Sequence, residues 1–339
     1  MSPKAFIALL LVTTAAVGGA VWTALDRPAV AVEERAGERL YPQLAARAND
    51  VARIEVTEKG RTTVVARTEA GWTMPDKADH PVRIEPVREL VAALAQLTVV
   101  EAMTAQPDRF PRLDVQDPAG EPDRSKRVVL KRADGTVLAD LVAGKTMATL
   151  GGAGGLYVRD QGRAWLVQGR VPLPYEPMVW LDRQAVDVGP DRLAEVKLMD
   201  GETALARLAR EGDGALALDG VPEGREADKV QTDRVAGLFE RMIFEDVRAA
   251  AGLAPDASGR WAEAGTKDGL VLRAKPARDG DQVWWLLSAE AAGATASDEV
   301  RAEAERLNAH LVRFAYKLPS WKTEVLNLPP EALTRARQS

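Results

Sequence analysis

The stretch Trp180-Leu181-Asp182-Arg183, with the run AVDVGPDRLAEV from Ala185 to Val196, lies near the midpoint of the 339-residue chain. Before it, a strand, a turn, a second strand, an amphipathic helix and further hairpins are predicted in order, and the same order begins again at Val196. We therefore interpret the chain as an internal duplication of one α+β unit built on an antiparallel sheet. Two unrelated α+β domains of similar composition are the alternative.

The first copy is predicted to open with a hairpin and to continue into a helix. Residues 51–56 alternate apolar and polar side chains, and Gly60 marks the turn before residues 62–67. The helix follows Pro86, with one apolar face formed by Val87, Leu90, Val91, Leu94 and Leu97. Later strands are predicted at residues 71–74, 99–102, 127–132, 137–142, 156–159 and 164–167.

The second copy is predicted to repeat these elements. Strands are expected at residues 196–199, 204–208 and 216–218, and a later hairpin at 269–273 and 282–287 with a turn from Pro276 to Asp281. Thr232 or Asp233 is expected to cap a helix with an apolar face formed by Val235, Leu238, Phe239 and Met242. A last helix is expected at about 297–312.

The N-terminal residues 6–25, FIALLLVTTAAVGGAVWTAL, contain no charge. A helix of about 20 apolar residues spans the hydrocarbon core of a bilayer, so we expect a single transmembrane anchor within residues 1–26. Lys4 favours a cytoplasmic N-terminus in the inner membrane, which would place the bulk of the chain in the periplasm. A cleaved signal peptide ending near Ala29-Val30-Ala31 is the alternative. Residues 27–50 are interpreted as a juxtamembrane linker.

Composition excludes several classes of function. The chain has no cysteine, which rules out disulfides and thiol chemistry, and its net charge of -5 without a basic stripe argues against nucleic acid. Gly144-Lys145-Thr146 is not a phosphate loop, because the required earlier glycine is Ala139. Residues 151–155 are interpreted as a flexible connector, with an anion-binding loop as the alternative. We predict no cofactor and no nucleotide.

No catalytic constellation is evident either. His80 and His310 are far apart in the sequence, so no metal site is predicted, and neither Ser258 nor Ser288 lies in a nucleophile elbow. Aromatic and junction residues are the candidates for an interface, for core packing or for a sugar-stacking groove. They are Trp72, Tyr157, Trp165, Trp180, Asp182, Arg183, Trp284, Trp285 and Tyr316.

The order and spacing of these elements resemble the family called domain of unknown function 4340. The resemblance rests on the Gly71-Trp72-Thr73-Met74 strand, the helix after it, the Trp180 junction and the closing Phe314-Ala315-Tyr316-Lys317 run, over residues 50–328. It implies a membrane-anchored extracytoplasmic protein, similar to auxiliary components of gliding-motility-type ABC transporters, with no agreed catalytic residues. The chain departs from the family by lacking a Trp in the Leu216 strand and by carrying the glycine run at 151–155.

The predicted organisation is an anchor (1–26), a linker (27–50), two α+β copies (51–183 and 184–328) and a tail (329–339). We expect a non-enzymatic auxiliary or binding subunit whose partners are the integral-membrane subunits of a transporter. A periplasmic binding protein for a small ligand or an envelope polymer is the second hypothesis. An enzyme that uses Asp and Glu alone is the third.

Overall fold

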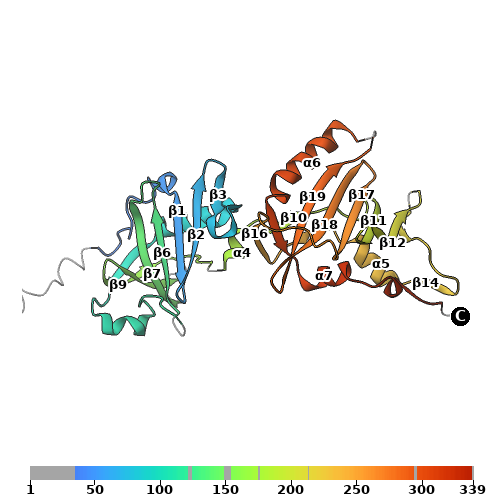
Figure 1. Cartoon of the computed structure of the whole chain (residues 1–339). Coiled ribbons are helices and arrows are strands. Elements are labelled where there is room, and N and C mark those ends of the chain that lie inside the picture. Colours follow the sequence, from blue (N-terminus) through green and yellow to red (C-terminus); the bar gives the residue numbers. More distant parts are fainter. Residues whose placement is uncertain are drawn as a thin grey trace, which may run out of the picture. The chain divides into compact units, whose positions relative to one another are not determined.

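The computed structural model describes residues 35–120, 124–148, 154–174, 176–212, 214–293 and 296–337. Contacts divide the chain into two compact units. Within the described ranges, the first comprises residues 35–72 together with Arg83–Pro177, and the second comprises Thr73–Val82 together with residues 178–337. Each sheet is antiparallel and is accompanied by a few helices (Figure 1), which confirms the sheet-rich α+β class.

The first sheet is a meander with one returning strand. Its order is β4-β3-β2-β1-β6-β7-β8-β9-β5. The strands are β1 (Arg53–Glu58), β2 (Arg61–Thr68), β3 (Gly71–Met74), β4 (His80–Pro81), β5 (Thr98–Ala102), β6 (Lys126–Lys131), β7 (Val137–Met147), β8 (Gly155–Asp160) and β9 (Arg163–Gln168). The alternating pattern of β1 places Ile54 and Val56 on the buried face.

Helix α3 (Ile84–Gln96) follows the short 3₁₀ segment η2 (Pro75–Lys77) and β4. It begins two residues before the predicted Pro86, and its buried residues are the predicted Val87, Leu90, Val91 and Leu94. Two further 3₁₀ segments, η1 (Ala48–Asp50) and η3 (Pro107–Leu113), belong to the first unit. Strand β7 contains Gly144-Lys145-Thr146, whose extended backbone does not form a phosphate loop.

The described part of the predicted linker is packed on the first unit. Leu40 and Leu44 are each 3 % exposed, and the Leu40 N–H donates to the carbonyl of Leu97 at 2.8 Å. The Val99 N–H also donates to the Glu38 carbonyl at 2.8 Å. From residue 35 onward the predicted juxtamembrane linker therefore belongs to the first unit, because its apolar side chains reach the core and its backbone pairs beside β5.

The second sheet has the order β13-β12-β11-β17-β18-β19-β20-β16. Its strands are β11 (Leu193–Asp200), β12 (Thr203–Arg210), β13 (Leu216–Leu218), β16 (Asp246–Ala249), β17 (Arg260–Thr266), β18 (Leu270–Asp279), β19 (Gln282–Ala291) and β20 (Phe314–Lys317). Two smaller sheets pair β10 (Gln184–Val186) with β15 (Met242–Ile243), and β14 (Arg225–Ala227) with β21 (Thr334–Ala336). The two sheets have the same topology if β4 is left out of the first. When the remaining strands of each sheet are renumbered in the order in which they occur along the chain, the two strand orders are identical.

The helices of the second unit are α4 (Pro177–Trp180), α5 (Lys229–Ala236), α6 (Asp298–Leu311) and α7 (Ser320–Leu326), with η4 (Pro330–Leu333) near the end. Helix α6 connects β19 to β20 and lies against the sheet in Figure 1. Its Asn308 side chain accepts from the Ala289 N–H at 2.8 Å and donates to the Ala289 carbonyl at 2.5 Å. The Asn308 amide thus provides hydrogen-bond partners for backbone groups of β19 beyond the point where the pairing of β19 with β20 ends.

Two predictions for the second copy need correction. Helix α5 is capped by Asp228 and ends at Ala236 before Gly237, so the buried Leu238, Phe239 and Met242 lie outside the helix. Pro276 lies within β18 and not in a turn. The pairing of β18 with β17 ends before Pro276, so a proline, which has no N–H, is tolerated at this position of the strand. The predicted tail forms η4 and then β21, which pairs with β14.

Some predictions lie outside the described residues. The anchor at residues 6–25 is one, and most of the glycine run at 151–155 is another. Over the described ranges, every helix is too short or too polar to cross a membrane.

Candidate functional site

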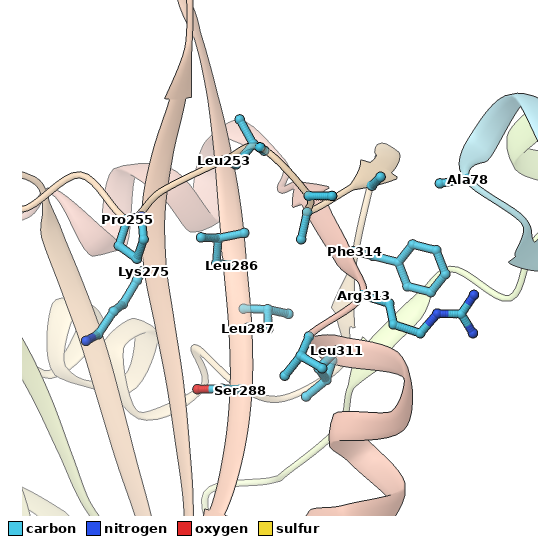
Figure 2. Close-up of a pocket in the computed structure, with 15 residues that line it drawn as sticks. Ala78, Leu253, Pro255, Lys275, Leu286, Leu287, Ser288, Leu311, Arg313 and Phe314 are labelled. Carbon is cyan, nitrogen blue, oxygen red and sulfur yellow. The ribbon is translucent and has the colours of Figure 1, made fainter.

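An open groove of about 730 Å³ lies on the second unit (Figure 2). Its lining is mainly apolar, and the polar side chains that contribute to it are Lys275, Ser288 and Arg313. No Asp or Glu is among its lining residues. The groove therefore combines an apolar wall with positive charge.

The edge strand β16 forms one side of this groove. It pairs with β20 so that Ala249 lies opposite Phe314, and the Ala250 N–H extends the ladder by donating to the Arg313 carbonyl at 2.9 Å. The chain then turns at Gly252, whose φ of 83° suits glycine, and crosses to β18, where Pro255 bridges to Ala277. This crossing segment presents Leu253 and Pro255 to the groove, as Figure 2 shows.

Strand β19 and the end of α6 form the other side. Trp285 and Leu287 are buried, whereas Leu286 and Ser288 are half-buried, as expected for residues that alternate between the two faces of a strand. Val312 follows α6 and is 56 % exposed. This exposed side chain extends the apolar wall of the groove toward solvent.

The charges of the groove are not neutralised by carboxylates of the described chain. The Lys275 ammonium lies 4.7 Å from the ring centroid of Trp261, and the Arg313 guanidinium lies 5.4 Å from that of Phe314. Neither cation is in an ion pair with a described carboxylate, and the described chain offers the Ser288 hydroxyl no hydrogen-bonding base. The groove thus has the chemistry of a surface that receives apolar and acidic groups.

A second pocket of about 490 Å³ brings the two histidines together. His80, Asp182, Glu303, His310 and Tyr316 all line it, although they come from distant parts of the sequence. Among the described residues, no group of three or more His, Asp or Glu side chains is arranged to hold a metal ion. His80 and His310 therefore line the same pocket, although they are far apart in the sequence.

His80 is 7 % exposed and packs between aromatic rings. Its ring centroid lies 5.2 Å from that of Phe244 and 4.7 Å from that of Phe314. Burial lowers the pKa of His80, and the nearby positive charge of Arg313 acts in the same direction, while Asp182 opposes it. The imidazole is therefore a neutral part of the core that borders the pocket.

A polar pocket of about 630 Å³ in the first unit contains three carboxylates, each bound to another side chain. Tyr41 donates to Asp160 at 3.0 Å, Arg127 pairs with Asp140 at 2.6 Å, and Arg159 pairs with Asp117. Burial raises the pKa of Asp160. Because each carboxylate already has a partner, the arrangement is typical of a structural network, and the carboxylate-dependent enzyme stays an untested hypothesis.

The residues predicted as candidates fall into three groups. Trp165, Trp180, Trp284, Trp285 and Tyr316 are buried and belong to the core. Trp72 and Tyr157 are half-buried, whereas Asp182 and Arg183 are exposed.

Two of the candidates, Asp182 and Tyr316, meet in the histidine pocket, and Trp72 lines a separate groove of the first unit. Leu253, Leu286 and Arg313, which line the groove of the second unit (the main groove), were not predicted as site residues. The only local feature of the sequence that could have indicated this groove was the apolar, Gly-containing segment at 249–255.

The fold defines a sheet-rich α+β protein with open grooves. A family model described as "Domain of unknown function (DUF4340)" matches residues 72–258, which is more than half of the chain. The chain belongs to this family. Searches of curated proteins and of solved structures found no match.

Proposed function

We propose that the protein is a membrane-anchored, extracytoplasmic auxiliary subunit that acts by binding and not by turnover. The observation that carries the proposal is the groove of the second unit, which has apolar walls, two cations and no carboxylate among its lining residues. Its occupant is an extracytoplasmic loop of an integral-membrane partner that presents apolar side chains and a carboxylate. The partner class is the transporter subunits that the family resemblance implies.

The proposed anchor is the uncharged segment at residues 6–25. Its length suits a single crossing of the bilayer, with the N-terminus in the cytoplasm and the two units in the periplasm. Gly18 and Gly19 give the segment a small-residue face for close packing against a partner helix. A tether also raises the local concentration of a weak binder, so that a modest groove suffices for association.

We also propose that the two units arose by duplication. The common strand order of the two sheets supports this, as does the position of one helix, α3 or α5, between the third strand and the strand that returns to the sheet edge. The second unit differs by the insertion of α6 between β19 and β20. The main groove adjoins this insertion, which is consistent with a binding role specific to the second unit.

The experiment compares two matched substitutions in the full-length chain. Val312→Asp places a negative charge at the groove, whereas Val230→Asp places the same charge on α5, where the side chain is 67 % exposed and outside the groove. Complexes are purified from membranes in mild detergent, and integral-membrane subunits are quantified by mass spectrometry. We expect Val312→Asp to reduce recovery of transporter subunits at least tenfold and Val230→Asp to leave it unchanged.

A photo-crosslinking residue at Leu253 should mark the same partner and should lose the crosslink in the Val312→Asp background. Purification of the wild-type chain alone from native membranes would contradict the proposal. Hydrolysis of a substrate with ordinary turnover by the full chain would favour the enzyme hypothesis instead.

A further inference from the structure

A second groove, on the first unit, has a different chemistry from the one above. We propose that it binds an amphiphile with an apolar chain and an anionic head group. The groove measures about 670 Å³, within the range of small-molecule sites, and lies between α3 and the packed residues 39–49. No Asp or Glu is among its lining residues, whereas three arginines are.

The floor of this groove is apolar. Val51, Val87 and Val91 contribute side chains that are 1 %, 4 % and 7 % exposed, and the half-buried Trp72 borders them. An aliphatic chain laid along it would remove its own surface from water, together with that of the walls, where Ala45 and Ala92 are exposed. An indole ring adds a flat apolar face to such a site.

The groove stays hollow because its walls are built from small side chains. Ala92 and Ala95 lie one turn apart on α3, and Ala45 and Ala48 have the same spacing on the segment that faces it. Larger residues at these positions would fill the space. Alanine on both walls therefore leaves room for the width of an alkyl chain.

The arginines provide the charge for a head group. Arg67 donates to the Asn49 carbonyl at 2.7 and 3.2 Å, and Arg39 donates to Thr98 Oγ1 at 3.2 Å and to the Gln96 carbonyl. These acceptors are neutral, so they orient the guanidinium groups without cancelling their charge. Within the described part of the chain, neither of these two arginines is in an ion pair with a carboxylate.

Arg88 on α3 is exposed, and the described chain provides no bonding partner for its side chain. A guanidinium in this situation is available to bind a carboxylate or phosphate through two parallel hydrogen bonds. Because α3 also supplies the apolar floor, one helix presents both parts of the site. An anionic amphiphile would contact the apolar walls and the arginines together, whereas a free anion would bind the arginines alone and leave the exposed alanines of the walls in water.

The test uses the full-length chain in a neutral non-ionic detergent, with binding counted by native mass spectrometry. Dodecyl phosphate and dodecanoate share the proposed chemistry and distinguish a phosphate head from a carboxylate head, and dodecanol has the same chain without charge. We expect one saturable site for at least one of the two anions and at least tenfold weaker binding of dodecanol.

Arg88→Glu should weaken binding of the anion about tenfold or more without loss of folding, because the side chain has no partner to lose. Arg109→Glu is the matched control, since it is exposed in the same unit, lies outside the groove and makes the same change of charge. Ala92→Trp should block the site by filling the hollow. Equal binding by wild type and Arg88→Glu would overturn the proposal.

Quenching of tryptophan fluorescence tests whether the amphiphile binds in this groove. A dodecanoate analogue brominated along its chain should quench a saturable fraction of tryptophan fluorescence in the wild type. Trp72→Phe should abolish that saturable fraction, whereas Trp321→Phe, which removes a half-exposed indole of α7 outside the groove, should not. Quenching that persists without Trp72, or anion binding that is displaced only by an acidic peptide, would refute the amphiphile site.

Discussion

Lys322 offers the sharpest test of what stabilises the second unit. Its side chain is fully buried, and its ammonium donates to the carbonyls of Gly237, Leu238 and Glu240 at 3.3, 2.6 and 2.8 Å. These carbonyls follow the end of α5, where backbone acceptors lack partners within the helix. The lysine therefore joins α7 to the turn after α5.

Lys322→Met keeps most of the apolar stem and removes the donor. The change leaves the carbonyls of Leu238 and Glu240 unpaired at about 1–3 kcal/mol each, whereas the Gly237 carbonyl still accepts from the Glu240 N–H at 3.2 Å. Against this, burial lowers the pKa of Lys322 to about 8, so below pH 8 the charged form costs about 3 kcal/mol relative to water. We expect a net loss of about 1 kcal/mol in the free energy of unfolding at pH 7.

The same numbers predict a dependence on pH. Between about pH 8 and the unfolded pKa near 10.5, the unfolded state binds more protons than the folded state, so the free energy of unfolding rises with pH. The wild type should thus gain stability relative to Lys322→Met across this window. The window closes above pH 10.5, where the amine is neutral in both states.

The assay is urea unfolding of the full-length chain, monitored by tryptophan fluorescence from pH 7 to 10.5. Lys229→Met on α5 is the control, because its side chain is 83 % exposed and only pairs with Asp233 at 2.8 Å. That control should lose less than about 0.5 kcal/mol. Unchanged stability of Lys322→Met, together with an absent pH slope relative to wild type, would refute the assigned role of the ammonium.

Three further changes should alter stability in the same assay. Trp180→Ala removes a fully buried indole and should lose about 3–5 kcal/mol, whereas Trp321→Ala, at a side chain 50 % exposed, should lose far less. With the assay extended to about pH 5, His80→Gln should abolish the loss of stability that the wild type shows between about pH 6.5 and 5, because burial lowers the folded pKa of His80 and the unfolded state then binds more protons. A persistent acid slope would contradict that assignment. Gly144→Ala should lose roughly 1–3 kcal/mol, since its Cβ would clash with backbone carbonyls at the end of η3, whereas Gly120→Ala meets open space and should be tolerated.

Local periodicity explains the successful predictions. Helix α3 was predicted because Val87, Leu90, Val91 and Leu94 recur at the helical period, and these four are its buried residues. Strand β17 was not predicted, because Arg260–Thr266 is rich in Ala, Glu and Gly, which have low strand propensity. Pairing with β11 on one side and β18 on the other overrides that propensity.

The sequence by itself determined the class of the fold, most strands and helices α3 and α6, because these depend on apolar side chains repeating over a few neighbouring residues. It also determined the charge balance and the absence of thiol chemistry. Only the tertiary structure decided that His80 and His310 share a pocket, and that Lys275 and Arg313 line a groove without a carboxylate. Such groups meet through strand order and chain crossings, which depend on contacts between distant residues and leave no periodic signal in the chain.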